Sequence, residues 1–283
     1  KTGARRLRSG RLEKQLARRP VFAAARHPED RSDMAASAPQ DRSQPDWATG
    51  ALVLPDGEVF WGRGIGATGA CVGEVCFNTS LTGYQEILTD PSYAGQIITF
   101  TFPHIGNVGA NEEDVETTTP AARGCIIRAD ISDPSNWRAV QHLDTWLKSM
   151  DMVGIAGVDT RRLTRHIRDA GAPNGAIVHQ PNTPIATAAL RAAASDWRGL
   201  EGADLAKEGS CTQAYQWTET RWKWGQGYGG LAAPKRHVVA VEFGAKRNIL
   251  RSLADLGCKV TVVPATATAR DILSDKPDGV CLS

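Results

Sequence analysis

The sequence lacks several features that would define whole classes of protein. It contains no run of about 18–20 apolar residues, the length that a helix needs to cross a bilayer. Its six cysteines show no paired short spacing, and no Cys/His cluster has the spacing of a zinc site. No P-loop and no G-x-C-x-G or G-x-S-x-G nucleophile motif occurs. We therefore expect no membrane segment and no metal site, and we expect reduced thiols in a cytoplasmic protein.

The composition is that of a globular protein, with 41% hydrophobic and 23% charged residues, and 283 residues suggest two domains. The net charge of +2 conceals a basic leader, because residues 1–33 hold ten Lys/Arg against four Asp/Glu. Such a leader is typical of a disordered or wrongly translated segment, although a nucleic-acid arm or a transit peptide has the same charge. Met34 is a candidate for the true start, and no apolar segment before it indicates secretion. We expect a disordered leader over 1–46.

Residues 47–224 are predicted to form an α+β domain rich in strands. Pro55-Asp56-Gly57 lies between two apolar strands and has the residue types of a hairpin turn. Further strands are expected at 75–78, 96–102, 125–128, 153–158 and 176–179. Helices are expected at 136–150, from Asp159 as N-cap to Gly171, and from Thr183-Pro184 to Ala194.

Residues 225–236 have the composition of a linker, and the pattern changes after them. Apolar strands at 237–243, 259–263 and 279–282 alternate with helices at 246–256 and 268–274, which is typical of a parallel, doubly wound α/β sheet. Such sheets bind ligands beyond the carboxyl ends of their strands, and Ser283 follows the third strand directly. We therefore expect residues 237–283 to be an incomplete α/β domain and the chain to be a fragment.

Three local motifs favour structural rather than chemical roles. Gly64–Gly69 matches G-x-G-x-x-G, but the residues that follow do not predict the helix that a dinucleotide site needs, which favours a loop between strands. Trp222 and Trp224, near basic residues, resemble a base-stacking platform but alternate like residues of a half-buried strand. Cys258 and Cys281 each lie on or beside a predicted buried strand without a nearby base, which favours inert core residues.

One helix is predicted to carry a basic face, formed by Arg161, Arg162, Arg165 and Arg168. Such a face is typical of a solvated surface or a subunit contact, and anion binding is a less specific alternative. His104 and His166 have no partner in the sequence, so no catalytic role is assigned to either.

Longer strings of residues indicate a family. They are NTSLTGYQEILTDPSY at 78–93, FPHIGNVG at 102–109, DTRRLTR at 159–165, FGAKRNI at 243–249 and PDGVCLS at 277–283. Together they closely resemble the small (glutaminase) subunit of carbamoyl phosphate synthetase, in order and across both domains from Ala51 to Ser283. The last two strings resemble the opening of that subunit's class I glutamine amidotransferase domain.

The resemblance implies a function and one site residue. Members of this family hydrolyse glutamine with a Cys–His–Glu triad and pass ammonia to a large subunit, which makes carbamoyl phosphate for arginine and pyrimidine synthesis. The triad would lie beyond Ser283, so no catalytic residue is expected in this chain. The Ser of the Thr-Asp-Pro-Ser-Tyr segment contacts glutamine in the family, and here it is Ser92, beside the stiff Asp90-Pro91 turn.

The resemblance also implies the partners. They are the large subunit, which is expected to hold ATP and Mg²⁺, and L-glutamine, with no cofactor in this chain, no nucleic acid and no membrane. An alternative is a docking module for the large subunit without chemistry of its own. A third reading, a nucleic-acid-binding protein that uses the leader and the Trp cluster, is disfavoured because the basic charge stops before the folded part begins.

Overall fold

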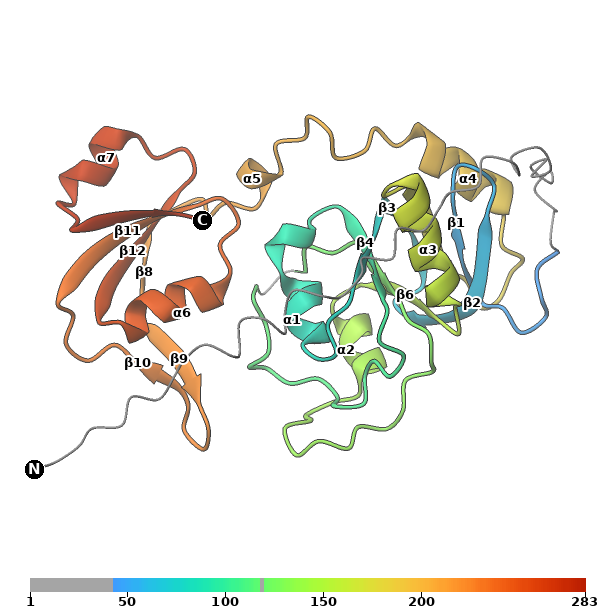
Figure 1. Ribbon diagram of the computed structural model, residues 1–283, viewed down its shortest axis with the longest axis horizontal. Coiled ribbons are helices and arrows are strands. Elements are labelled where there is room, and N and C mark those ends of the chain that lie inside the picture. Colours follow the sequence, from blue (N-terminus) through green and yellow to red (C-terminus); the bar gives the residue numbers. More distant parts are fainter. Residues whose placement is uncertain (1–42, 118–119) are drawn as a thin grey trace, which may run out of the picture. The chain divides into compact units, whose positions relative to one another are not determined.

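A computed structural model describes residues 43–117 and 120–283 (Figure 1). Residues 1–42, which include the candidate start Met34 and most of the predicted leader, lie outside the described residues. By their contacts, residues Asp41–Ser283 group as one unit, in which the strands form two main sheets and a separate two-stranded ribbon. No helix in the described ranges is long and apolar enough to cross a membrane.

The first sheet is a closed barrel of seven strands in the order β1-β2-β6-β5-β4-β3-β7. Its strands are β1 (Gly50–Val53), β2 (Val59–Gly66), β3 (Gly69–Asn78), β4 (Gln96–Phe100), β5 (Gly124–Ile126), β6 (Val153–Ala156) and β7 (Asn174–His179). The pairs β3/β4, β4/β5 and β5/β6 are parallel and the other four are antiparallel. The prediction of a strand-rich domain is confirmed, but closure into a barrel was not anticipated.

The expected hairpin turn joins β1 to β2. Leu54 N donates to Glu58 O, and Gly57 N donates to Leu54 O at 3.0 Å each. The carboxylate of Asp56 accepts from Glu58 N at 2.9 Å, and Gly57 adopts a φ of 93°, which only glycine takes at little cost. The local residues therefore determine this turn without help from the rest of the fold.

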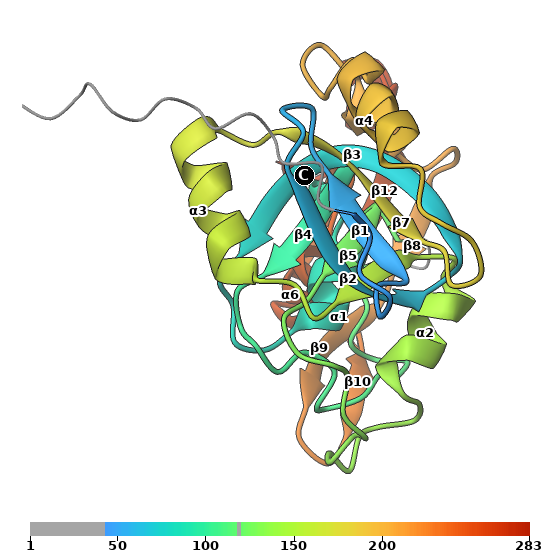
Figure 2. The same cartoon turned by 90° about the vertical axis from the view of Figure 1, so that its right-hand side faces the viewer.

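The barrel strands β4, β5 and β6 are buried on both faces, because helices pack against the barrel (Figure 2). Alternate residues separate the two sides: Ile97 and Ile126 belong to one apolar cluster, while their neighbours Ile98 and Cys125 belong to another that includes residues of the two helices α1 (Tyr84–Thr89) and α2 (Leu143–Ser149). Two-sided burial explains why these strands show continuous apolar runs instead of an alternation of apolar and polar residues.

The helix α3 (Thr160–Ala170) was predicted correctly, but two other helices were not. Asp159 caps α3, its carboxylate accepting from Arg162 N at 3.1 Å. The helix expected from residue 136 begins only at Leu143, and the helix expected from Thr183-Pro184 is α4 (Thr187–Asp196), with Ala186 at its N-cap. A short helix, α5 (Leu205–Glu208), precedes the second sheet.

The motif Gly64–Gly69 was assigned to a loop, and this is wrong for most of it. Gly64 and Gly66 lie within β2, and Gly69 begins β3, so only Ala67 and Thr68 connect the strands. A dinucleotide site would need a helix directly after the motif, but the element that follows is the strand β3.

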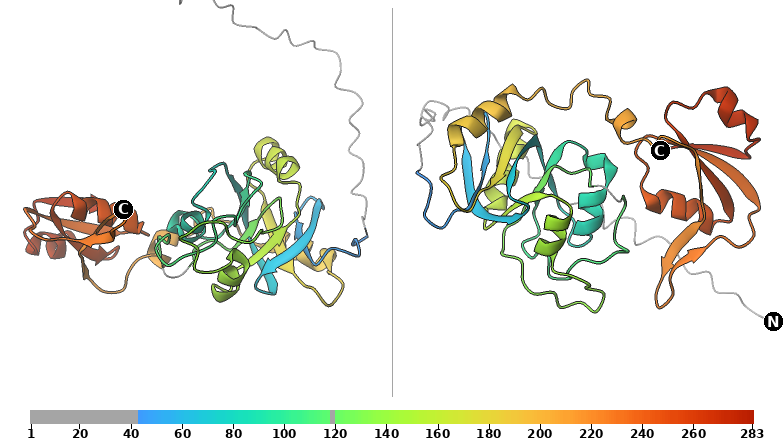
Figure 3. Two further views of the ribbon diagram at one scale, coloured as in Figure 1. Left: turned by 90° about the horizontal axis from the view of Figure 1, so that it is seen from below. Right: turned by 180° about the vertical axis from the view of Figure 1, so that it is seen from behind.

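The second sheet contains the strands predicted at the C-terminal end of the sequence. Its order is β13-β11-β12-β8, with β11 (Arg236–Glu242), β12 (Cys258–Pro264) and β13 (Gly279–Leu282) parallel and β8 (Tyr215–Trp217) antiparallel at one edge. The helices α6 (Arg247–Asp255) and α7 (Ala269–Ser274) lie on opposite faces of this sheet (Figure 3). On one face, Ala240 of β11 packs with Leu250 of α6. On the other face, Val239 and Val241 pack with Ile272 of α7. This is the doubly wound pattern.

The segment 225–236, expected to be a linker, contains β10 (Gly227–Gly230), which pairs with β9 (Glu219–Lys223) as a separate ribbon. Tyr228 lies opposite Trp222, so the expected strand character of the tryptophan region is confirmed. Since β8 pairs with β12, the second sheet also includes residues that precede the expected linker.

Candidate functional site

The candidate site residue Ser92 lies in a tight turn directly after α1. Pro91–Tyr93 form one turn of 3-10 helix, and Asp90 caps it by accepting from Ser92 N at 2.9 Å. Pro91 occupies the first position, where its missing N–H is no loss. The Ser92 side chain is exposed, while Asp90 is buried. The stiff Asp-Pro turn is therefore present as predicted, with its serine hydroxyl open to a ligand.

The buried carboxylate of Asp90 also contacts the loop that follows β11. Its Oδ2 lies 2.7 Å from Nζ of Lys246. The hydrogen bond to Asp90 raises the pKa of Lys246 above its ordinary value, so the ammonium is fully charged at neutral pH. A Cβ placed on Gly244 would lie 3.2 Å from Cβ of Pro91, so the backbone of this loop passes close to the turn.

A second connection joins the same two regions. Asn248 N, at the start of α6, donates to Oε2 of Glu116 at 3.0 Å. Glu116 N in turn donates to Oγ1 of Thr89 at 2.9 Å, in the last turn of α1. The end of α1 and the start of α6 are thus linked through one residue, Glu116, by its backbone N–H on one side and its carboxylate on the other.

The loop after β11 lies at the point where the strand order of the second sheet reverses. From β11 the chain crosses to β12 on one side and then to β13 on the other. Open α/β sheets bind ligands at the carboxyl ends of the strands at this point. Ser283 N donates to Val241 O at 3.1 Å, so the end of β13 lies beside the end of β11. The Ser92 turn therefore lies against the edge of the sheet where a ligand is expected.

One cysteine lies near this edge but is not a nucleophile. Cys211 N donates to Oε2 of Glu242, the last residue of β11, at 2.9 Å. Burial and the neighbouring Glu242 raise the pKa of the Cys211 thiol to about 12, so it is protonated at neutral pH. A thiol of this kind cannot attack an amide.

The other cysteines do not favour nucleophilic chemistry either. Burial raises the pKa of Cys71, Cys76 and Cys125 to about 12. Cys258 and Cys281 pack against an apolar cluster, as predicted. Across residues 43–117 and 120–283, no group of three His, Cys, Asp or Glu side chains comes close enough to hold a metal ion.

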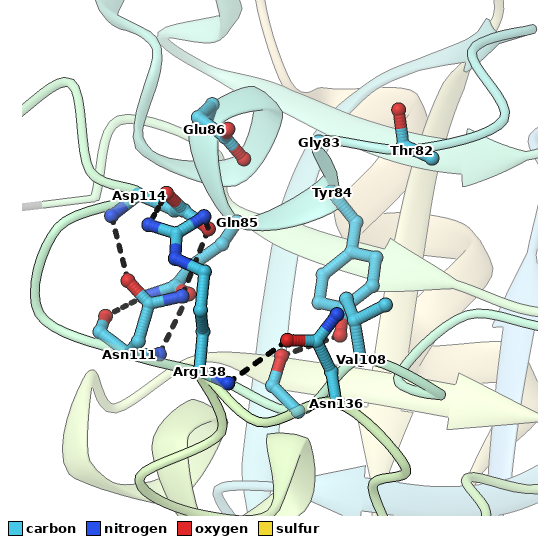
Figure 4. Close-up of a pocket in the computed structure, with 11 residues that line it drawn as sticks. Thr82, Gly83, Tyr84, Gln85, Glu86, Val108, Asn111, Asp114, Asn136 and Arg138 are labelled. Atoms are coloured by element: carbon cyan, nitrogen blue, oxygen red, sulfur yellow. Dashed lines mark hydrogen bonds and ion pairs between the residues drawn. The ribbon is translucent and has the colours of Figure 1, made fainter. Parts of the chain in front are cut away.

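A polar pocket beside α1 was missed by the sequence analysis (Figure 4). It encloses about 270 Å³. Its lining residues are Thr82, Gly83, Tyr84, Gln85, Glu86, Val108, Gly109, Asn111, Asp114, Asn136 and Arg138. Nη2 of Arg138 lies 2.7 Å from Asp114, and the side chain of Gln85 both donates to and accepts from the backbone of Asn111. Burial raises the pKa of Glu86. These bonds hold α1 in place just before the Ser92 turn.

The tryptophan of β9 contacts the same region. Trp222 Nε1 donates to Oε2 of Glu113 at 3.1 Å, and the guanidinium of Arg138 lies 5.0 Å from the ring centroid. Tyr228 OH donates to Glu113 O at 2.9 Å. The Trp222 ring thus packs within the protein, as expected for a residue of a half-buried strand. Trp224, in contrast, is exposed.

The histidines without an assigned role and one arginine of the basic face also find contacts. His166 Nε2 lies 3.3 Å from Oδ2 of Asp56, and the His104 ring packs edge-on against Phe102. Arg162 forms an ion pair with Glu58, and its guanidinium lies 4.5 Å from the centroid of Phe60. The remaining arginines of the face, Arg161, Arg165 and Arg168, line a separate hollow with Arg128.

Comparison with known proteins shows which family this chain is similar to. The family model "Carbamoyl-phosphate synthase small chain, CPSase domain" matches residues 52–177. The chain is 60% identical over 256 residues to the carbamoyl phosphate synthase small chain of Agrobacterium fabrum, covering 88% of this chain. The corresponding proteins of Ruegeria pomeroyi and Rhizobium meliloti are 59% and 57% identical, each over 83% of this chain. Residues 52–177 thus match the carbamoyl phosphate synthase small-chain model, and most of the chain is similar to proteins of that name.

The matches to the small chains do not extend over the whole length of these relatives. The alignments cover 63%, 61% and 60% of the three relatives, so the chain spans less than two thirds of their length. The match of the family model falls within the barrel, from β1 to β7.

Proposed function

We propose that this chain serves in the small subunit of a glutamine-hydrolysing carbamoyl phosphate synthase, a ligase with a glutaminase half-reaction. In this proposal the subunit releases ammonia from glutamine and supplies it to a large subunit, where ATP and Mg²⁺ act. The chain's own part is the barrel domain and the opening of a class I amidotransferase-like domain. The proposal is supported by the relatives, which are named as carbamoyl phosphate synthase small chains.

The contact between the Ser92 turn and the loop after β11 supports a glutamine site at this place in the molecule. The ion pair of Asp90 with Lys246 at 2.7 Å, with Pro91 packed near Gly244, sets the Ser92 turn beside the strand ends where an α/β sheet binds its ligand. A serine contributed by one domain to a ligand held by another needs such a fixed contact.

Ser92 has the chemistry to bind the amino-acid end of glutamine. Its hydroxyl both donates and accepts, so it suits either the carboxylate or the ammonium of a zwitterion. Since its backbone N–H is engaged by Asp90, the turn keeps one conformation while the side chain stays exposed. We assign Ser92 to binding and not to the chemical step.

The test is the variant Ser92→Ala in the small subunit assembled with its large subunit. We expect KM for glutamine to rise about tenfold, the effect of one lost hydrogen bond to a charged group, with a smaller change in kcat. Activity with free ammonia should not change, because ammonia bypasses the glutamine site. Ser80→Ala, which removes an exposed hydroxyl outside the turn, is the matched control. Equal effects on glutamine-dependent and ammonia-dependent activity would contradict the assignment of Ser92.

We also expect the purified 283-residue chain to release no glutamate from glutamine. The thiols of Cys71, Cys76, Cys125 and Cys211 are protonated at neutral pH, because burial raises their pKa values. A coupled glutamate assay measures this directly. Glutamate release above the uncatalysed rate would show that the chain carries a nucleophile of its own.

A further inference from the structure

An arginine-lined hollow lies where three parallel strands of the barrel end. The strands are β4, β5 and β6, and the residues that follow them form the walls: Thr101 and Pro103 after β4, Arg128 after β5, and Thr160 at the start of α3 after β6. The hollow encloses about 490 Å³, a volume in the range of small-molecule sites. Figure 2 shows α3 running beside the barrel next to β4.

Four arginines from two parts of the chain line this volume. Arg161, Arg165 and Arg168 are spaced by four and three residues, so they share one face of α3, and Arg128 comes from the strand end opposite. Arginine forms paired hydrogen bonds with phosphate and carboxylate groups, which makes this cluster suited to an anion with several oxygens.

The nearby acidic groups neutralise only part of this charge. Asp159 lies 3.5 Å from Nη1 of Arg128, and Asp169 lies 3.2 Å from Nε of Arg168. In the part of the chain that the structure describes, neither Arg161 nor Arg165 has a carboxylate within ion-pair distance. Two cations on adjacent turns of one helix repel each other, and a bound anion would remove that repulsion.

The lining favours a small ligand over a protein partner. Thr101, Thr160 and Thr164 also line the hollow. Thr164 Oγ1 donates to Thr160 O at 2.7 Å, which leaves its lone pairs to accept. None of the lining residues is aromatic. Protein interfaces are centred on buried aromatic and apolar anchors, whereas oxyanion sites need donors at defined positions.

We propose that this hollow binds a small polyanion through its phosphate or carboxylate groups, at a site separate from the Ser92 turn. Arg161 and Arg165 supply the unneutralised charge, and Arg128 and Arg168 close the site from either side. The proposal does not depend on the proposed function, because it rests on the barrel alone.

The experiment compares two double variants of the 283-residue chain by isothermal titration calorimetry at low ionic strength, where charge–charge attraction is little screened. R161Q/R165Q removes the two unneutralised arginines of the hollow. R198Q/R270Q removes the same charge at two exposed positions outside it. The probes are inorganic pyrophosphate for phosphate chemistry and citrate for carboxylate chemistry, with an oligo-glutamate peptide representing an acidic protein segment.

We expect R161Q/R165Q to bind pyrophosphate or citrate at least about tenfold more weakly than the unchanged chain, and R198Q/R270Q to bind within about twofold. Circular dichroism and thermal unfolding confirm that both variants fold. If both double variants bound the anions equally weakly, the net charge of the chain would explain the effect, and the proposal would be overturned. No binding of either small anion, or tight binding of the oligo-glutamate peptide alone, would overturn it as well, the latter in favour of a docking surface.

Discussion

The ammonium of Lys246 lies 2.7 Å from the carboxylate of Asp90, and the other oxygen of that carboxylate accepts from Ser92 N at 2.9 Å. One buried side chain therefore fixes both the serine turn and the loop after β11. Asp90 is only 7% exposed, so losing its cationic partner leaves a poorly hydrated charge.

Replacement of Lys246 by Met tests this contact. The variant keeps the length of the side chain but leaves Asp90 without its cation, and we expect it to lower the free energy of unfolding by about 1–2 kcal/mol. This expected loss is smaller than that for a fully buried ion pair, because the Lys246 side chain is 41% exposed. Urea unfolding measures it. Lys259→Met, at an exposed position of β12, is the control and should change the stability little.

The same ion pair predicts a dependence on alkaline pH. The folded-state pKa of Lys246 is raised, chiefly by its hydrogen bond to Asp90, so protonation favours the folded state. Its contribution is complete below the unfolded pKa of about 10.4 and is lost as the pH rises through the higher folded pKa. The stability difference between the unchanged chain and Lys246→Met should thus be constant from neutral to mildly alkaline pH and shrink above it. A difference that already falls near neutral pH would contradict this.

Asp144 is expected to contribute to acid denaturation. Burial alone would raise its pKa, but bonds from Lys148 Nζ at 2.5 Å and Gly66 N at 2.7 Å outweigh burial and lower it. Its stabilisation is therefore present above the unfolded pKa of about 3.9 and is lost as the pH falls through the lower folded pKa.

The variant Asp144→Asn measures this contribution. Since Lys148 is largely exposed, we expect a loss of about 1 kcal/mol at pH 7, which shrinks below about pH 4. Thermal unfolding between pH 3 and pH 7 follows it. Asp133→Asn, at an exposed loop position, is the matched control. A loss that stayed constant down to pH 3 would trace the effect to packing and not to charge.

Gly64→Ala should disrupt the barrel. A Cβ at Gly64 would lie 1.9 Å from Cδ2 of His179, whose ring Nδ1 is 3.1 Å from Ala67 O. Because the ring belongs to the neighbouring part of the barrel wall, we expect a loss of about 2–3 kcal/mol or failure to fold. In contrast, a Cβ at Gly230 meets nothing within 4 Å, so Gly230→Ala should be tolerated. Comparison of the two melting temperatures is decisive, and equal values would rule out crowding at His179.

Arg251 is expected to hold the β9–β10 ribbon against α6. Its Nε lies 2.5 Å from Oε1 of Glu219, and its guanidinium is 3.7 Å from the ring centroid of Tyr228. Because Glu219 can be rehydrated, Arg251→Met should cost about 2 kcal/mol rather than the full penalty of a buried charge. In Arg251→Met, hydrogen exchange should show that the backbone amides of β9 are less protected than in the unchanged chain. Arg270→Met, at an exposed position of α7, should leave those amides unchanged.

Elements whose signals are local were predictable from the sequence. The Pro55-Asp56-Gly57 turn, the Asp159 cap of α3 and the capping box of Thr268 with Asp271 all satisfy their hydrogen bonds within a few residues. The alternation of strands and helices after residue 236 is also a local signal. It was sufficient to predict a doubly wound sheet, and the structure shows apolar clusters on both faces of that sheet.

The two misplaced helix starts have tertiary causes. Val140 N donates to Ala110 O, and Ala110 N to Gln141 O, so the residues before α2 are extended beside a distant segment although Trp137 and Val140 have helical spacing. At α4, Ile185 N donates to Oε1 of Gln44, far away in the chain, so the residues before Thr187 do not continue the helix. Such competition from distant partners leaves no trace in the periodicity.

The candidate site was only partly accessible to sequence analysis. The resemblance indicated Ser92, and Asp90-Pro91 indicated a rigid turn, but no local pattern connects Asp90 with Lys246. The polar pocket beside α1 combines Gln85 of that helix with Asn111 and Arg138 from two separate loops, and no local pattern connects these three positions. The arginine face of α3 was visible in the sequence, whereas its position at the three strand ends depends on closure of the barrel.

Closure of the barrel has a consequence for how the protein forms during synthesis. The wall is completed only when β1 pairs with β7, and in this pairing Gly50 lies opposite His179. A ribosome must therefore deliver the whole intervening stretch before the earliest strand gains its second neighbour, so the nascent chain spends an extended period with unpaired edges. Pairings so distant in the chain slow the search for the native topology, and edges of this kind are what molecular chaperones protect.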